Sequence, residues 1–87
     1  MFIVVSHNIK TPALFWGAAQ KNLPNLPEGG VKRVLNVLPN ENMDHCTCLW
    51  EADSIETLEN YLREKVGNAS TETYYQVNEA NAVGLGG

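Results

Sequence analysis

The chain has few basic side chains, few cysteines and no long apolar run. Its 87 residues carry six Lys and Arg against ten Asp and Glu, a formal net charge of −4 at pH 7. Binding to nucleic acid needs clustered Lys and Arg, so this balance argues against a nucleic-acid partner. No apolar run approaches the roughly 20 residues of a membrane span, and the apolar start, Phe2 to Val5, is too short for a signal peptide. We therefore expect a cytoplasmic protein with no membrane partner.

The two cysteines, Cys46 and Cys48, lie two positions apart. A disulfide between such positions of an extended strand has poor geometry, so we expect two reduced thiols. The same pair has no second cysteine pair with which to make a zinc site, and strand alternation turns His45 to the opposite side. The spacing therefore predicts small core side chains, with no metal and no cofactor.

A length of 87 residues with 44% hydrophobic side chains predicts one domain, 1–87. Apolar and β-branched runs predict strands over residues 2–7, 31–38, 45–51 and 71–78. Thr11-Pro12 starts a helix that extends to about Asn22, and Asp53 with Glu56 starts another that ends at Gly67. Residues 79–87 read as an irregular tail.

The order β-α-β-β-α-β is typical of an α+β, ferredoxin-like fold. It predicts a four-stranded antiparallel sheet with two helices on one face. Right-handed crossovers place the third strand between the first and second, and the first strand between the third and fourth.

Both sides of the predicted strands carry apolar residues, although two helices can cover only one face. The first strand alternates Ile3 and Val5 with Phe2 and Val4, and the second sets Leu35 and Val37 against Val34 and Leu38. Leaving either set in water would cost several kcal/mol at about 25 cal/mol per Å². The pattern therefore predicts a homodimer in which two sheets pack face to face.

The layout, and above all the run Cys48-Leu49-Trp50-Glu51-Ala52-Asp53-Ser54 leading into a helix, resembles the dimeric α/β-barrel superfamily of ferredoxin-like proteins. It is similar there to small bacterial proteins of unknown function, some of whose relatives bind nickel. The resemblance implies a pocket at the dimer interface. Members include cofactor-independent oxygenases, haem-degrading enzymes and small-ligand binders, but no catalytic residue of those enzymes matches a motif here.

Two titratable residues are candidates for acid–base chemistry. His7 ends the first predicted strand, near the starts of the third and fourth, where it could act as a base or anchor a ligand; the alternative is a histidine bonded to a loop carbonyl. Glu51 faces away from Trp50, and would be an acid or base with a raised pKa if that side is enclosed. At a frayed strand end it would be only a solvated charge.

Aromatic and amide side chains supply the candidate ligand contacts, because small-molecule pockets combine apolar walls with a few polar groups. Core packing and edge exposure are the competing explanations for the same residues. The predicted contacts are Trp16, Asn36, Trp50, Tyr74 and Asn78.

These features favour a small homodimeric protein that binds an apolar or aromatic ligand between its sheets. The alternatives are a cofactor-independent oxygenase- or isomerase-like enzyme that uses His7, and a metal-responsive, nickel-binding protein. The identity of the ligand does not follow from the sequence.

Overall fold

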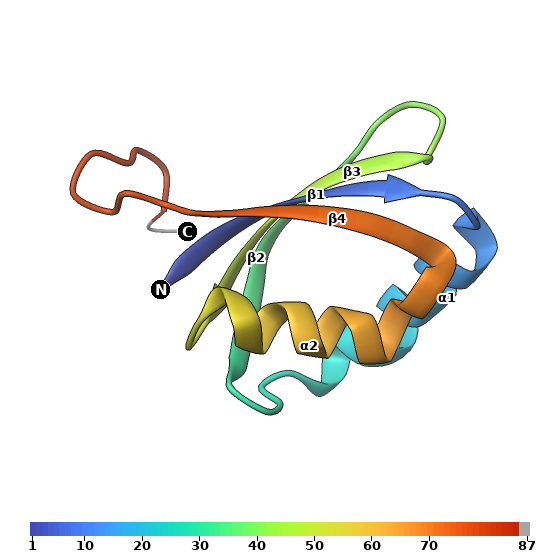
Figure 1. Cartoon of the computed structure of the whole chain (residues 1–87). Helices are drawn as coiled ribbons and strands as arrows, with labels where there is room; N and C mark the ends of the chain where they lie inside the picture. Colours follow the sequence, from blue (N-terminus) through green and yellow to red (C-terminus); the bar gives the residue numbers. More distant parts are fainter. Residues whose placement is uncertain (86–87) are drawn as a thin grey trace.

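The computed structural model describes residues 1–85, which form one four-stranded antiparallel sheet and two α-helices. The sheet order is β2-β3-β1-β4, and both helices lie on one face (Figure 1). The predicted α+β, ferredoxin-like layout and strand order are thus confirmed. In chain order the elements are β1 (Phe2–Ile9), α1 (Pro12–Asn22), η1 (Leu23–Asn25), β2 (Val31–Pro39), β3 (His45–Ala52), α2 (Ile55–Val66), η2 (Gly67–Ala69) and β4 (Ser70–Gln76).

The two helices begin and end at residues with clear local causes. Pro12 opens α1, where a missing N–H costs nothing. The N-cap of α2 is Ser54, whose hydroxyl accepts a hydrogen bond from the backbone N–H of Thr57 at 3.0 Å. The predicted cap, Asp53, is therefore wrong by one residue. Gly67 ends α2 with a φ of 53°, which favours glycine.

The core lies between the sheet and the helices. Alternate residues of β1 point into it, so that Ile3, Val5, His7 and Ile9 are buried while the residues between them are more exposed. β3 alternates in the same way, and α2 contributes its apolar face. The rest of the buried apolar set is Phe15, Val31, Cys46, Cys48, Trp50, Ala52, Leu58, Tyr61, Leu62 and Ala69.

Strand β2 departs from the simple alternation that the sequence predicts. Val34 pairs with Trp50 and Asn36 with Leu49, so Leu35 has no partner of its own and forms an irregularity in the ladder. Val34 then faces the core with Val37, which pairs with Cys48. The grouping of Leu35 with Val37 is therefore wrong, because an extra residue reverses the side-chain direction.

Strand β4 ends at Gln76, two residues earlier than predicted. The backbone N–H of Val77 donates to the carbonyl oxygen of Phe2 at 2.9 Å. The chain then leaves the sheet as a loop beyond its end, near the N-terminus (Figure 1). Residues 79–85 are irregular, as predicted; residues 86–87 of the predicted tail lie outside the described residues. No helix in the described part of the chain has the length and apolar character to cross a membrane.

Candidate functional site

The residues predicted to form one pocket lie on two sides of the sheet. His7, Trp50 and Tyr74 belong to the helix side, where Trp16 of α1 also lies. Asn36 and Asn78 lie on the open side. In this chain the aromatic residues of the predicted set therefore pack on the helix side and not on the open face. Neighbouring strand residues point to opposite faces, so a strand that places Trp50 in the core cannot also offer it to a second sheet.

A hollow of about 490 Å³ lies on the open face, at the end of the sheet nearest the tail. Val4, Leu49 and Tyr75 belong to three neighbouring strands at one level of the sheet, as their pairing shows. Leu38 and Tyr75 are each 61% exposed, which is unusual for large apolar side chains. The rest of the lining consists of Asn36, Leu38, Thr47 and Cys48 of the sheet and Val77, Asn78, Asn81, Ala82, Val83 and Leu85 after β4.

The hollow combines apolar walls with a few amide groups. The apolar side chains would bind a flat hydrocarbon or aromatic surface, and the amides can donate or accept hydrogen bonds at its edge. Asn36 and Asn78 lie here as the sequence predicts for ligand contacts, although the residues that accompany them are Val4, Leu49 and Tyr75. The alternation sets Val4 on the side opposite Ile3 and Val5, but it does not tell which of the two sides the helices leave open.

Glu51 lies on the open face and is paired with a basic residue. Its carboxylate accepts a hydrogen bond from Nε of Arg33 at 2.8 Å, across the β2–β3 ladder. That hydrogen bond lowers the pKa of the Glu51 carboxyl. The raised pKa was predicted for an enclosed face, and in the single chain the Arg33 pair keeps the pKa of this carboxyl low, so the acid or base role of Glu51 stays a prediction. The solvated strand end fits the observed pair better.

His7 lies in the interior and is 1% exposed. Strand pairing places Cys46 of β3 and Glu72 of β4 beside it, as the sequence-predicted strand order requires. The Nδ1 atom of His7 lies 2.9 Å from Oε2 of Glu72, and the hydroxyl of Ser70 donates to the same carboxylate oxygen. The ring packs edge-on against Phe15, with centroids 5.0 Å apart. The alternative prediction was a hydrogen bond between His7 and a loop carbonyl. The structure instead pairs the ring with the carboxylate of Glu72.

Glu72 is the residue that the sequence reading missed. Burial alone would raise the pKa of its carboxyl, but the hydrogen bonds from His7 and Ser70 outweigh that effect and lower the pKa. In the sequence it stands between two threonines in a polar strand, and such a carboxylate normally faces water. Only the cross-strand pairing of His7 with Glu72 could have identified it.

We expect the free energy of unfolding of Glu72→Gln to fall less steeply between pH 7 and pH 3 than that of wild type. A carboxyl whose pKa is lower in the folded state stabilises the protein fully above its unfolded pKa, and this stabilisation is lost as pH falls through the folded pKa. Urea unfolding between pH 7 and pH 3 measures the slope. The matched control is Glu79→Gln in the exposed tail, which should leave the slope unchanged. Equal slopes for wild type and Glu72→Gln would contradict the role given to this pair.

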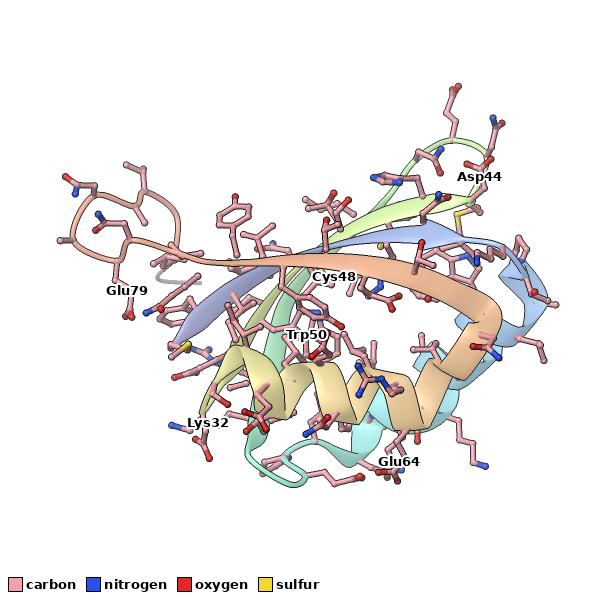
Figure 2. All side chains as sticks on the ribbon, in the orientation of Figure 1. Lys32, Asp44, Cys48, Trp50, Glu64 and Glu79 are labelled. Carbon is pink, nitrogen blue, oxygen red and sulfur yellow. The ribbon has the colours of Figure 1, made fainter. Side chains whose placement is uncertain are left out.

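The predicted aromatic contacts pack in the helix-side layer. Trp16 and Trp50, with Phe15 and Tyr61, line an apolar hollow of only about 40 Å³ between the sheet and the helices. Figure 2 shows Trp50 pointing from the sheet toward α2. This agrees with the core-packing explanation for both tryptophans. Tyr74 is half-buried on the same side, where burial raises the pKa of its hydroxyl.

Both cysteines are buried and form no disulfide, and their sulfur atoms lie 3.5 Å apart, within hydrogen-bond distance. Burial raises the pKa of both thiols, so they are poor nucleophiles and poor metal ligands in this state. His45 lies on the other face, where its Nε2 is 3.1 Å from the hydroxyl of Ser6. Within residues 1–85 no three His, Cys, Asp or Glu side chains gather in a way that could hold a metal ion.

Comparison of the chain with protein-family models, with curated proteins and with solved structures finds no match.

Proposed function

We propose that the protein binds a small apolar or aromatic molecule on the open face of its sheet, and that a second copy of the chain closes this face. The observation that carries the proposal is the hollow of about 490 Å³ with Val4, Leu49 and Tyr75 among its lining residues and amides at its edge. A volume of this size suits a ligand of one to three rings.

Three features support closure by a second copy. The helices cover one face only (Figure 1), and Leu38 and Tyr75 are left largely exposed on the other. The same face carries Glu51 and Arg33 in a mutual ion pair, so its charges are already balanced and do not oppose contact with an identical face. Two such faces related by a two-fold axis present the same apolar residues to each other.

We expect Leu49→Glu to abolish dimerisation and to weaken ligand binding. Leu49 is half-buried beside Val4 in the middle of the hollow floor, and a carboxylate there would have to lose its water in the closed dimer. Light scattering with size-exclusion chromatography should give twice the 9.6 kDa chain mass for wild type and the chain mass for the variant. Titration with 2-naphthol, followed by the methyl NMR signals of Val4, should give at least about tenfold weaker binding, since lost apolar contacts and a buried charge act together.

The matched control is Gln20→Glu, which adds the same charge on an exposed position of α1. It should leave both the mass and the naphthol affinity unchanged. A wild-type protein that stays at the chain mass over the full concentration range would refute the dimer. A Val4 signal that ignores 2-naphthol would refute the ligand site.

A further inference from the structure

Beyond the hollow, the open face of the sheet is polar. Ser6 and Asn8 alternate with the buried residues of β1 and therefore point to this face. Strand pairing sets further polar side chains beside them on β3 and β4. The six form two polar rows across the three strands: Thr47, Ser6 and Thr73, then His45, Asn8 and Thr71. Both helices lie on the other side of the sheet, so no helix covers the polar rows (Figure 1).

The polar rows adjoin the hollow directly. Thr47 belongs to the first row and also lines the hollow. Val4 and Tyr75, which line the hollow, stand two positions from Ser6 and Thr73 on the same strands and point to the same face. The open face is therefore one continuous surface with an apolar half and a hydrogen-bonding half. A ligand seated in the hollow reaches the polar rows if it extends along the strands.

The polar rows keep most of their hydrogen-bonding capacity free and carry no strong charge. Within residues 1–85 their one side-chain hydrogen bond joins Oγ of Ser6 and Nε2 of His45 at 3.1 Å. Hydroxyl and amide groups both donate and accept hydrogen bonds. Among the described residues, no Asp, Glu, Lys or Arg belongs to the polar rows or lines the hollow. The face therefore matches a neutral group that itself both donates and accepts.

We infer that the ligand of the open face is amphipathic: an aromatic ring system in the hollow, joined to a neutral polyhydroxyl group such as a sugar ring over the polar rows. This ligand class rests on the proposed function, because the aromatic part must occupy the hollow. Neighbouring strands lie about 4.8 Å apart, and residues two apart on a strand about 6.8 Å. The polar rows thus cover about 10 Å by 7 Å, which suits a single sugar ring.

The test compares 2-naphthol with 2-naphthyl β-D-glucoside in NMR titrations of the full-length protein. The glucoside should bind about tenfold more tightly, because one or two additional net hydrogen bonds give that gain. Both compounds should shift the methyl signals of Val4, and only the glucoside should shift the amide signals of Ser6 and Thr73. The corresponding glucuronide should bind less tightly than the glucoside, since no Lys or Arg of the described lining pairs with its carboxylate.

The double variant Ser6→Ala/Thr73→Val removes two hydroxyls of the first row, and neither residue lines the hollow. It should bind the glucoside about fivefold or more weakly than wild type and bind 2-naphthol equally well. Retained naphthol binding also shows that the variant is folded. The matched control is Thr11→Val, at an exposed position before α1 where the hydroxyl makes no capping bond. It should leave both affinities unchanged.

The wild-type titrations separate failure of this ligand class from failure of the proposed function. If 2-naphthol shifts Val4 and the glucoside binds no more tightly, the amphipathic class is refuted and the open-face site stands. If neither compound shifts Val4, both are refuted. A glucuronide that binds as tightly as the glucoside would overturn the neutral class. Equal glucoside affinity in wild type and Ser6→Ala/Thr73→Val would overturn the role of the polar rows. Because the wild-type comparison needs no variant, it decides the ligand class even if the double variant does not fold.

Discussion

The His7→Leu variant is expected to unfold with a free energy about 2–4 kcal/mol lower than wild type, because it leaves Glu72 buried without its main partner. Only 11% of the Glu72 side chain is exposed. Apart from His7, its carboxylate accepts a hydrogen bond from the hydroxyl of Ser70. Urea unfolding at pH 7 measures the loss. For a small domain this is a large share of a total stability of about 5–15 kcal/mol.

The same substitution at the other histidine is the matched control. His45 is exposed, and within residues 1–85 its side chain bonds only to the Ser6 hydroxyl while its backbone hydrogen bonds do not depend on the ring, so His45→Leu should change stability by less than about 0.5 kcal/mol. The double variant His7→Leu/Glu72→Leu adds a second check. Removing both partners removes the stranded charge, and most of the lost stability should return. A double variant that is no more stable than His7→Leu would contradict the assignment of the cost to Glu72.

Gly30→Ala is expected to lower the free energy of unfolding by about 2–4 kcal/mol, since two penalties add. Gly30 has a φ of 88°, a region that side chains rarely adopt. A Cβ there would lie 2.8 Å from Oδ2 of Asp53 and 2.9 Å from Cγ2 of Thr57. The backbone N–H of Asp53 also donates to the Gly30 carbonyl oxygen at 2.9 Å. A forced shift would therefore disturb the entry to α2 as well as that to β2.

Gly29 provides the control, because it shares the conformation but not the crowding. Its φ is 56°, and a Cβ built on it meets nothing within 4 Å. Gly29→Ala should therefore cost only the conformational penalty, about 1 kcal/mol. Thermal and urea unfolding of the two variants would separate the terms, and equal losses would show that the contact with Asp53 and Thr57 is unimportant.

Much of the fold followed from local patterns. Pro12 and Gly67 marked a helix start and a helix end, and the spacing of Ile55, Leu58 and Leu62 gave the buried face of α2. The strand order followed from the order of the elements and the handedness of crossovers. Where the local pattern was interrupted, the prediction was wrong: an unpaired Leu35 reversed the faces assigned within β2.

The candidate sites were less predictable than the fold. His7 was recognisable as a titratable residue in an apolar strand, but the alternation that buries Ile3 and Val5 also turns His7 toward the helices. That places it away from the open face, where Asn36 and Asn78 lie. Which face of the sheet is buried depends on where the helices pack. Because the strands carry apolar residues on both faces, the sequence could not tell which face that would be.

The sequence by itself determined the element order, the α+β layout and the excess of apolar residues over what two helices can cover, because periodicity and turn chemistry act over a few residues. The tertiary structure alone decided that His7 meets Glu72, 65 positions later in the chain, and that Arg33 holds Glu51 ionised. It also decided that the tail helps to line the hollow on the open face. Such contacts depend on strand register and packing, which bring distant residues together with no trace in the local pattern.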